Sequence, residues 1–301
     1  MRSAPRALDR RLTLAAQALL LAAAVGLGVL LLRDRVGAAV GLLAGAGGAL
    51  GAGRLLGRRW TRRTRALAEP FPPAWRELLL ERYDHYQRLP APLRERFERD
   101  VRIFLAETRI TGIGMEPDDE LRLLVAASAA TLSLGWPEYD WDQLTEVLVY
   151  PDDFDRDYNV GGQELSGQAH GWGTVILSAP TLHDSFDDPD DAYHVGLHEF
   201  AHLLDLEQTQ FDGIPVGLSS GRMDEWVAVM RKEMERLERR KSVLDPYGAE
   251  GPEELFAVAV EAFFEAPLAL RARHQELYGL LRDYFAQDPA AWDDARGLFL
   301  P

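Results

Sequence analysis

The chain has 301 residues, a formal net charge of −15 at pH 7 and no cysteine. The absence of cysteine excludes disulfides, cysteine-ligated zinc, iron–sulfur clusters and thiol catalysis, so any metal must be held by histidines and carboxylates. The charge is unevenly distributed: residues 1–65 contain twelve arginines and two aspartates, and the rest of the chain is strongly acidic. Because an acidic surface repels phosphate backbones, we expect no direct binding to nucleic acid.

Residues 1–65 have the composition of a membrane anchor. Leu12–Leu32 contains no charged residue over 21 positions, and a second uncharged run of 18 residues covers 36–53. A run of this length can cross a bilayer as a helix. We predict a transmembrane hairpin with helices at about 12–32 and 36–53. The alternative is a single span followed by a Gly/Ala-rich linker, since the second run is only weakly hydrophobic.

Arginines on both sides of this hairpin determine its predicted orientation. Four arginines precede the first run and six follow the second, whereas only the short turn Arg33–Arg35 lies between them. Positively charged flanks remain on the cytoplasmic side of a membrane. We therefore expect the protein in the inner (cell) membrane, with residues 66–301 facing the cytoplasm.

Residues 66–301 are predicted to form a domain of the α+β class, mostly helical with a small sheet. Apolar residues recur at spacings of three and four, which predicts helices over Trp75–Leu89, Leu93–Glu107 and Glu120–Leu134. Short runs rich in β-branched residues predict strands over Glu146–Tyr150 and Gly173–Ser178. The second strand could pair with an extended peptide substrate or be internal to the sheet. Further helices are predicted near 189–206, 222–240, 252–265 and 267–286.

The segment His198–His202 has the sequence HEFAH, which is an HExxH pattern. Two histidines four positions apart on a helix project from the same face, so both can bind one zinc ion. The intervening Glu199 lies beside the metal and can take a proton from a water bound there. The flanking sequence agrees with a helix, because Asp188 can cap it and Pro189 suits its first position.

The third ligand has two candidates, Glu254 and Glu261, which lie in the predicted helix 252–265. This helix is apolar on nearly every face and should be buried, and a buried carboxylate is costly unless a metal or a partner compensates it. The two glutamates are seven residues apart on one side of the helix, so spacing does not separate them. Either one completes a site of two histidines and one glutamate for one zinc per chain, with a fourth position left for water.

Two neighbouring residues have weaker claims to a role in this site. His194 lies four residues before His198, and we interpret it as a packing histidine because a glutamate already fills the third place. Asp205 lies three residues after His202. It could orient a ligand imidazole or be a solvated residue at the end of the helix.

The HEFAH sequence is followed in order by Gly213–Pro215 (GIP), Asp245–Tyr247 (DPY), Glu254–Val258 (ELFAV) and Glu261–Phe264 (EAFF). This series resembles the Mlc titration factor A (MtfA) family of zinc-dependent peptidases and, more distantly, the catalytic domain of anthrax lethal factor. The resemblance implies a zincin-type metallopeptidase domain with aminopeptidase-like activity. It also implies that Glu254 is the third zinc ligand, that Glu261 lies behind the ligands, and that Tyr247 steadies the oxyanion during catalysis.

The same resemblance implies a rival function. A zinc-containing regulatory protein could sequester a transcriptional repressor that is linked to the control of sugar uptake. The intact Glu199 favours catalysis, because a structural zinc needs no general base. We therefore expect an enzyme that hydrolyses peptide bonds in a peptide or protein substrate, with a repressor as a candidate partner.

Overall fold

The structure is a computed structural model that describes residues 61–155, 158–160, 165–206 and 211–292. Two compact units divide the chain, one made of residues 70–137 and 141–301 and the other of residues 1–69 and 138–140. The predicted membrane spans at 12–32 and 36–53 lie outside the described residues. Within the described ranges, every helix is too short or too polar to cross a membrane.

Four helices begin the larger unit: α3 (Pro73–Arg82), α4 (Asp84–Arg88), α5 (Ala91–Glu107) and α6 (Asp119–Ser133). The predicted helix over 75–89 is interrupted at Tyr83, which is extended (φ −120°, ψ 95°) and turns its hydroxyl to Thr131 Oγ1 of α6 at 2.6 Å. The side chain of Asp118 caps α6 by accepting the N–H of Leu121 at 2.8 Å. α6 is buried along almost its whole length, as its Ala/Leu-rich sequence predicts.

The small sheet contains β1 (Ile110–Gly112), β2 (Glu146–Tyr150), β3 (Gly167–Ala169) and β4 (Thr174–Ser178) in the order β1-β2-β4-β3. β1, β2 and β4 are parallel, and β3 runs antiparallel to β4. The predicted strands β2 and β4 are confirmed. Of the two alternatives for β4, the internal strand is confirmed and pairing with a substrate is excluded, because β4 is bonded on both sides by β2 and β3. Among the described strands, β1 and β3 form the edges of the sheet.

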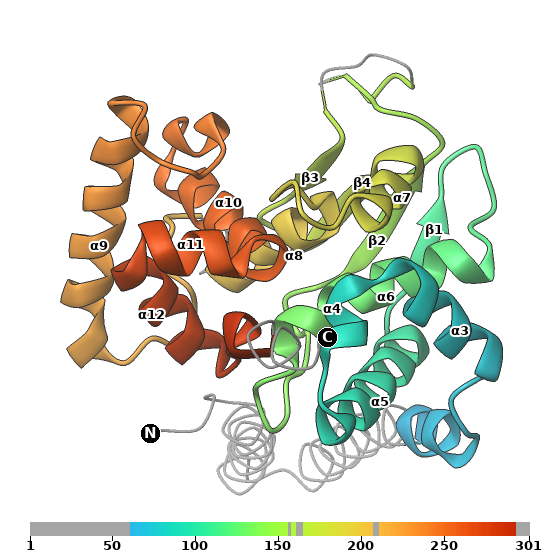
Figure 1. The fold of residues 1–301 in the computed structure, drawn as a ribbon. Coiled ribbons are helices and arrows are strands. Elements are labelled where there is room, and N and C mark those ends of the chain that lie inside the picture. The colour runs from blue at the N-terminus through green and yellow to red at the C-terminus, as the bar shows by residue number, and fades with distance from the viewer. Residues whose placement is uncertain (1–60, 156–157, 161–164, 207–210, 293–301) are drawn as a thin grey trace, which may run out of the picture. The chain divides into compact units, whose positions relative to one another are not determined.

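Two helices follow the sheet, α7 (Ala179–Asp187) and α8 (Val195–Asp205), and α8 lies between the sheet and the C-terminal helices (Figure 1). The predicted start of α8 near residue 189 is wrong. Asp188 ends α7 instead of capping α8. His194 caps α8 with its side chain, whose Nδ1 accepts the N–H of Leu197 at 3.2 Å.

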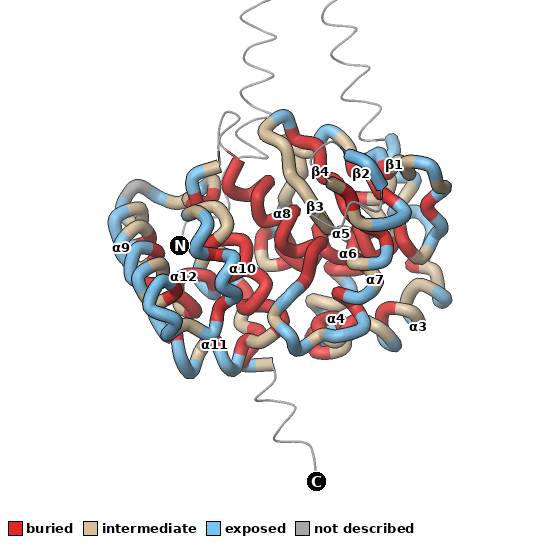
Figure 2. Tube along the Cα trace, turned by 90° about the horizontal axis from the view of Figure 1, so that it is seen from above, coloured by how far each residue is buried: buried red, intermediate tan, exposed pale blue. Residues whose placement is uncertain are grey.

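The C-terminal part contains α9 (Ser220–Glu238), the 3-10 helix η1 (Pro246–Ala249), α10 (Pro252–Glu265), α11 (Pro267–Arg273) and α12 (Gln275–Phe285). The predicted helix over 267–286 is broken at His274, because the imidazole turns inward and its Nδ1 lies 2.5 Å from Glu233 Oε2 of α9. Figure 2 shows that α8 and α10 are buried along nearly their whole length. Two buried helices in contact therefore form the centre of this unit.

α6 and α8 approach each other closely at Gly196. A Cβ atom at this position would lie 2.3 Å from Ser128 Oγ and 2.8 Å from Ser128 Cβ. Both distances are too short for a non-bonded contact, so the glycine allows α8 to pack directly against α6.

We predict that Gly196→Ala lowers the free energy of unfolding by about 1–3 kcal/mol, because the added methyl group must push two packed helices apart. The matched control is Gly279→Ala in α12, where no neighbouring atom lies within 4 Å of the added Cβ. That change should stabilise the protein by about 0.5–1 kcal/mol, because alanine favours a helix more than glycine does. Urea unfolding of both variants checks the prediction, and an unchanged midpoint for Gly196→Ala would contradict it.

Candidate metal centre

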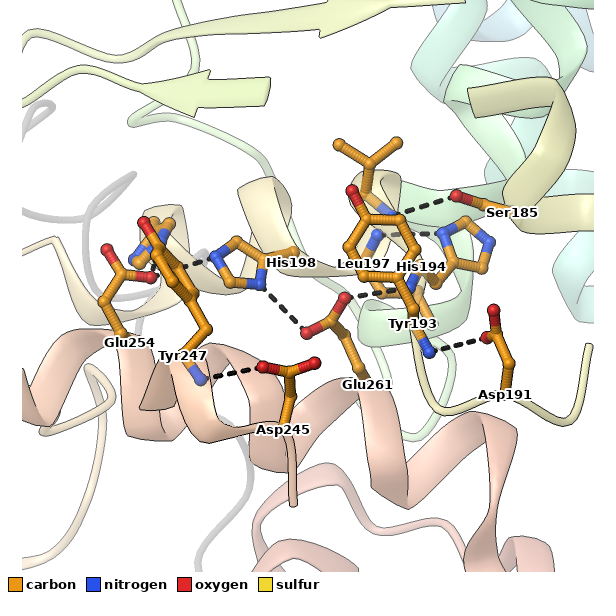
Figure 3. A network of polar contacts seen from close by, with 12 residues as sticks. Ser185, Asp191, Tyr193, His194, Leu197, His198, Asp245, Tyr247, Glu254 and Glu261 are labelled. Atoms are coloured by element: carbon orange, nitrogen blue, oxygen red, sulfur yellow. Dashed lines mark hydrogen bonds and ion pairs between the residues drawn. The ribbon is translucent and has the colours of Figure 1, made fainter. Parts of the chain in front are cut away.

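Three candidate ligand atoms converge where α8 meets α10. His198 and His202 lie one turn apart on α8, and Glu254 lies in the first turn of α10. Glu254 Oε2 is 3.0 Å from His198 Nε2 and 3.4 Å from His202 Nε2 (Figure 3). The three residues each offer a ligand atom within 4.8 Å of the others. Two imidazole nitrogens and one carboxylate oxygen make a donor set that suits zinc and leaves a fourth position open.

Glu261 lies on the other side of His198. Its Oε2 is 3.0 Å from His198 Nδ1, and its Oε1 accepts the N–H of His194 at 2.8 Å. With Nδ1–H held by this carboxylate, Nε2 is the nitrogen that faces Glu254, and it would offer a lone pair to a metal once its proton is displaced. The geometry therefore separates the two glutamates that spacing left equivalent, with Glu254 beside both imidazoles and Glu261 behind one of them.

The centre carries an excess of buried negative charge. Burial lowers the pKa of His198, but the neighbouring Glu261 and Glu254 carboxylates outweigh burial and raise this pKa well above its ordinary value. Burial opposes ionisation of Glu254, but hydrogen bonds from His198 and His202 lower its pKa to about 2. Among the described residues, His202 Nδ1 and Glu199 Oε2 are buried without a hydrogen-bond partner. Two imidazole nitrogens and the Glu254 carboxylate, with the acidic groups of Glu199 and Glu261 around them and one Glu199 oxygen unpaired, fit a site that is completed by a divalent cation.

Glu199 is buried beside this centre, 5% exposed, with the backbone of β3 against it. A Cβ atom on Gly167 would lie 2.5 Å from Glu199 Oε1, so the strand can approach this closely only as glycine. Burial raises the pKa of Glu199 to about 7, although the two histidines lower it and the carboxylates of Glu254 and Glu261 raise it further. A carboxyl group with this pKa can both accept and release a proton near neutral pH.

Tyr247 lies at the exposed side of the centre. Its ring centroid is 5.9 Å from that of His198, and the Asp245 side chain fixes the turn by accepting the N–H of Tyr247 at 2.7 Å. The residue is 43% exposed, so it lies at the surface and not in the core. Burial of the hydroxyl, together with the nearby Glu254 carboxylate, raises the pKa of Tyr247 to about 12. The hydroxyl therefore keeps its proton and can donate a hydrogen bond.

His194 and Asp205, which had weaker claims to a role in the site, both hold local structure in place. His194 is fully buried and caps α8, as described above, which agrees with its interpretation as a packing histidine. Asp205 is also buried, so it is not a solvated residue, and its carboxylate does not bond to an imidazole of the described residues. Its carboxylate accepts the backbone N–H groups of Asp212, Gly213 and Ile214 at 2.8–3.2 Å and so organises the loop that follows α8.

Two aromatic residues near the centre were missed by the sequence analysis. Tyr193 bonds through its hydroxyl to Ser166, beside β3, and burial near the Glu261 and Glu199 carboxylates raises its pKa to about 12. The ring centroid of Phe211 lies 5.5 Å from that of His202. Neither residue belongs to a spacing pattern, so only the folded chain brings them to the histidines.

We predict that Glu254→Ala loses zinc far more than Glu261→Ala does. Loss of a residue behind a ligand weakens metal binding by about 10–100-fold, and loss of a direct ligand should cost more than this. The matched control is Glu253→Ala, which removes the neighbouring carboxylate from the same helical turn and should leave zinc affinity unchanged. Zinc content by mass spectrometry and zinc affinity by competition with a chelator measure the ranking. A larger loss in Glu261→Ala would reverse the assignment of the third ligand.

Comparison with known proteins identifies the family of the chain. The family model described as glucose-regulated metallo-peptidase M90 matches residues 58–286. An uncharacterised protein of Synechocystis sp. is 31% identical over 236 residues, which cover 73% of this chain and 86% of the relative. The Mlc titration factor A of Edwardsiella ictaluri is 30% identical over 268 residues, which cover 81% of this chain and 98% of the relative. That of Pectobacterium atrosepticum is 28% identical over 225 residues, or 69% and 81% of the two chains.

Because the family model covers most of the chain and these relatives align over most of their own length, the chain belongs to the Mlc titration factor A family of glucose-regulated metallo-peptidases.

Proposed function

We propose that the chain is a zinc-dependent peptidase. The observation that carries this proposal is the meeting of His198, His202 and Glu254 beside Glu199, a buried carboxyl group with an unpaired oxygen. A structural zinc takes four protein ligands and needs no base, whereas a catalytic zinc takes three and keeps one position open. Three ligands and an adjacent base therefore favour catalysis.

Each residue of the centre has a separate role in the proposed hydrolysis. Zinc, when bound, supplies a Lewis acid that polarises the scissile carbonyl and lowers the pKa of water. Glu199 takes a proton from the attacking water and later gives it to the leaving amine, which its pKa of about 7 supports. Tyr247 donates a hydrogen bond to the carbonyl oxygen as negative charge develops there. Glu261 holds the imidazole of His198 in orientation.

An extended substrate would pair with the outer edge of β3. Ser178 N–H of β4 donates to Ser166 O, and His170 N–H donates to Thr174 O of β4. Ser166 and His170, which flank β3, therefore direct their backbone groups toward β4. In an antiparallel pair the intervening residues point the other way, which leaves Gly167 and Ala169 with backbone groups at the edge that no other described strand covers. A peptide that adds a strand there brings a backbone carbonyl next to Glu199, against which Gly167 lies.

We predict that Glu199→Gln lowers kcat by about 100–10,000-fold, the range that a general acid–base group contributes. Zinc content and the unfolding midpoint should not change, because the amide has nearly the same shape. Hydrolysis of aminoacyl nitroanilides and of an unstructured peptide measures the loss. In the same assay Tyr247→Phe should lower kcat by about 10–1000-fold. Full activity in Glu199→Gln would refute this catalytic assignment.

The resemblance that implied aminopeptidase-like activity extends the proposal to aminoacyl substrates. It also supports a second candidate, a regulatory protein that sequesters a transcriptional repressor, because the relatives carry the name Mlc titration factor A. The two candidates differ in their dependence on Glu199. A zinc-loaded protein that hydrolyses no peptide and still binds a repressor would favour the regulatory candidate.

We further propose that residues 1–65 anchor the protein in the inner membrane and leave the peptidase domain in the cytoplasm. The support is in the sequence: two adjacent uncharged runs, arginines on both outer flanks, and a connecting turn too short to hold a domain. The uncharged runs contain neither acid nor histidine, so they contribute anchoring and no chemistry.

The hairpin predicts that both of its ends lie in the cytoplasm. A reporter that is active only in the cytoplasm and one that is active only in the periplasm, each fused before Met1 or after Arg65, measure the two positions. Cytoplasmic signal at both ends agrees with the hairpin. Signal on opposite sides would indicate the single span, and recovery of the full-length protein in the soluble fraction without detergent would refute an anchor.

A further inference from the structure

The hairpin that joins β3 to β4 presents an aromatic surface that the proposed chemistry does not use. Trp172 is 69% exposed, more than any other large hydrophobic residue in the described part of the chain. Its indole stacks on the imidazole of His170, with ring centroids 4.3 Å apart and planes 8° from parallel. The imidazole in turn bonds through Nε2 to the Tyr158 hydroxyl at 3.0 Å. The indole, the imidazole behind it and the partly exposed ring of Tyr158 form one ordered aromatic cluster at the surface.

The backbone of this turn is rigidly held. Gly173 N–H donates to His170 O at 2.7 Å, and Thr145 bonds to the turn twice, from its N–H to Gly173 O at 2.7 Å and from its hydroxyl to Trp172 O at 2.9 Å. Gly173 has a φ of +89°, and a Cβ atom there would lie 1.8 Å from Gln143 O, so the turn requires glycine. A rigid aromatic side chain loses little conformational entropy when it binds a partner.

The strand β3 connects this turn to the metal centre. Gly167 lies against Glu199, and His170 follows three residues later, which is roughly 10 Å along an extended strand. β3 therefore runs from Glu199 toward the aromatic turn. A substrate that pairs antiparallel with β3 runs in the opposite direction, so its residues near His170 and Trp172 precede the scissile bond.

The face of the sheet agrees with this placement. Successive side chains of a strand alternate between its faces, so Gln168 and His170 lie on the face opposite Gly167 and Glu199. The Tyr158 hydroxyl, which lies within hydrogen-bond distance of both Gln168 and His170, supports this assignment. A substrate side chain on that outer face would meet the indole of Trp172 without approaching the metal centre.

From these contacts we infer that His170 and Trp172 form a subsite for an aromatic or large aliphatic side chain about three residues before the scissile bond. This inference rests on the proposed peptidase function and extends it from aminoacyl substrates to internal bonds of extended peptides. An aminoacyl substrate has one residue before the scissile bond and ends short of Trp172. It therefore serves as an internal control.

The test compares the full-length, zinc-loaded wild type with Trp172→Ala, Trp172→Phe and a control, Leu268→Ala, which removes another exposed hydrophobic side chain from α11. Unstructured peptides are first digested to locate a cleaved bond by mass spectrometry. Two versions of one peptide then carry Phe or Ser three residues before that bond. We expect the wild type and Leu268→Ala to prefer Phe by about 10-fold in kcat/KM, the scale of one aromatic contact.

Trp172→Ala should abolish this preference, mainly through KM, and Trp172→Phe should retain most of it. Hydrolysis of an aminoacyl nitroanilide should remain within about twofold of the wild type in all variants. The same Phe preference in Trp172→Ala, or an equal loss on the nitroanilide, would overturn the subsite.

A binding measurement separates failure of the subsite from failure of the peptidase function. Fluorescence anisotropy gives the Kd of the labelled Phe and Ser peptides for Glu199→Gln, with and without Trp172→Ala. Tighter binding of the Phe peptide that depends on Trp172 supports the subsite even if the wild type cleaves no peptide, which would refute only the peptidase proposal. Equal binding of both peptides overturns the subsite.

Discussion

The contact between the Glu261 carboxylate and α8 is the interaction on which the metal centre depends. One oxygen of Glu261 accepts the backbone N–H of His194 at the start of α8, and the other lies beside Nδ1 of His198 one turn later. A single buried side chain of α10 therefore fixes both the N-terminal end of α8 and the orientation of the His198 imidazole. Because Glu254 lies two turns earlier on α10, the same packing of α8 against α10 also brings the third candidate ligand to the histidines.

This arrangement has a cost that a metal ion can offset. Glu199, Glu254 and Glu261 bring three carboxylates into a mostly buried space with only two imidazoles. Buried carboxylates are unfavourable unless a cation compensates them, and ligand residues that fold together transfer part of the metal-binding free energy to the folded state. The binding site and the stability of the α8–α10 contact are therefore linked.

Sequence reasoning found the parts of the molecule that local pattern determines. The HEFAH spacing places two histidines on one helical face whatever the tertiary structure, and β2 and β4 have enough β-branched residues to be recognised. β1 and β3 have three residues each, which is too short for an alternating pattern. α7 was missed, and α8 was extended backwards because Asp188 and Pro189 resemble a helix start, whereas the buried contacts of His194 determine the actual end.

Sequence spacing could not identify the third candidate ligand, for a physical reason. Residues seven apart on a helix share a face, so Glu254 and Glu261 both point toward α8, and only the position of α8 along α10 assigns each to one ring nitrogen. Asp205 was undetermined for a similar reason. Its partners are backbone N–H groups of a loop seven to nine residues away. Because almost every residue has such a group, the sequence does not indicate which ones Asp205 binds.

Side chains of β3 alternate between the two faces of the sheet, and this affects how the sequence of such a protein can change in evolution. The side of the strand that touches Glu199 is formed by backbone at Gly167, so the environment of the proposed base is independent of the side chains on the other face. Residues such as Gln168, and those of the adjoining turn, can be exchanged without altering the wall against which the base is held. If Glu199 is the base, substrate preference can therefore change in evolution, or be redesigned, while the group that transfers the proton keeps its surroundings.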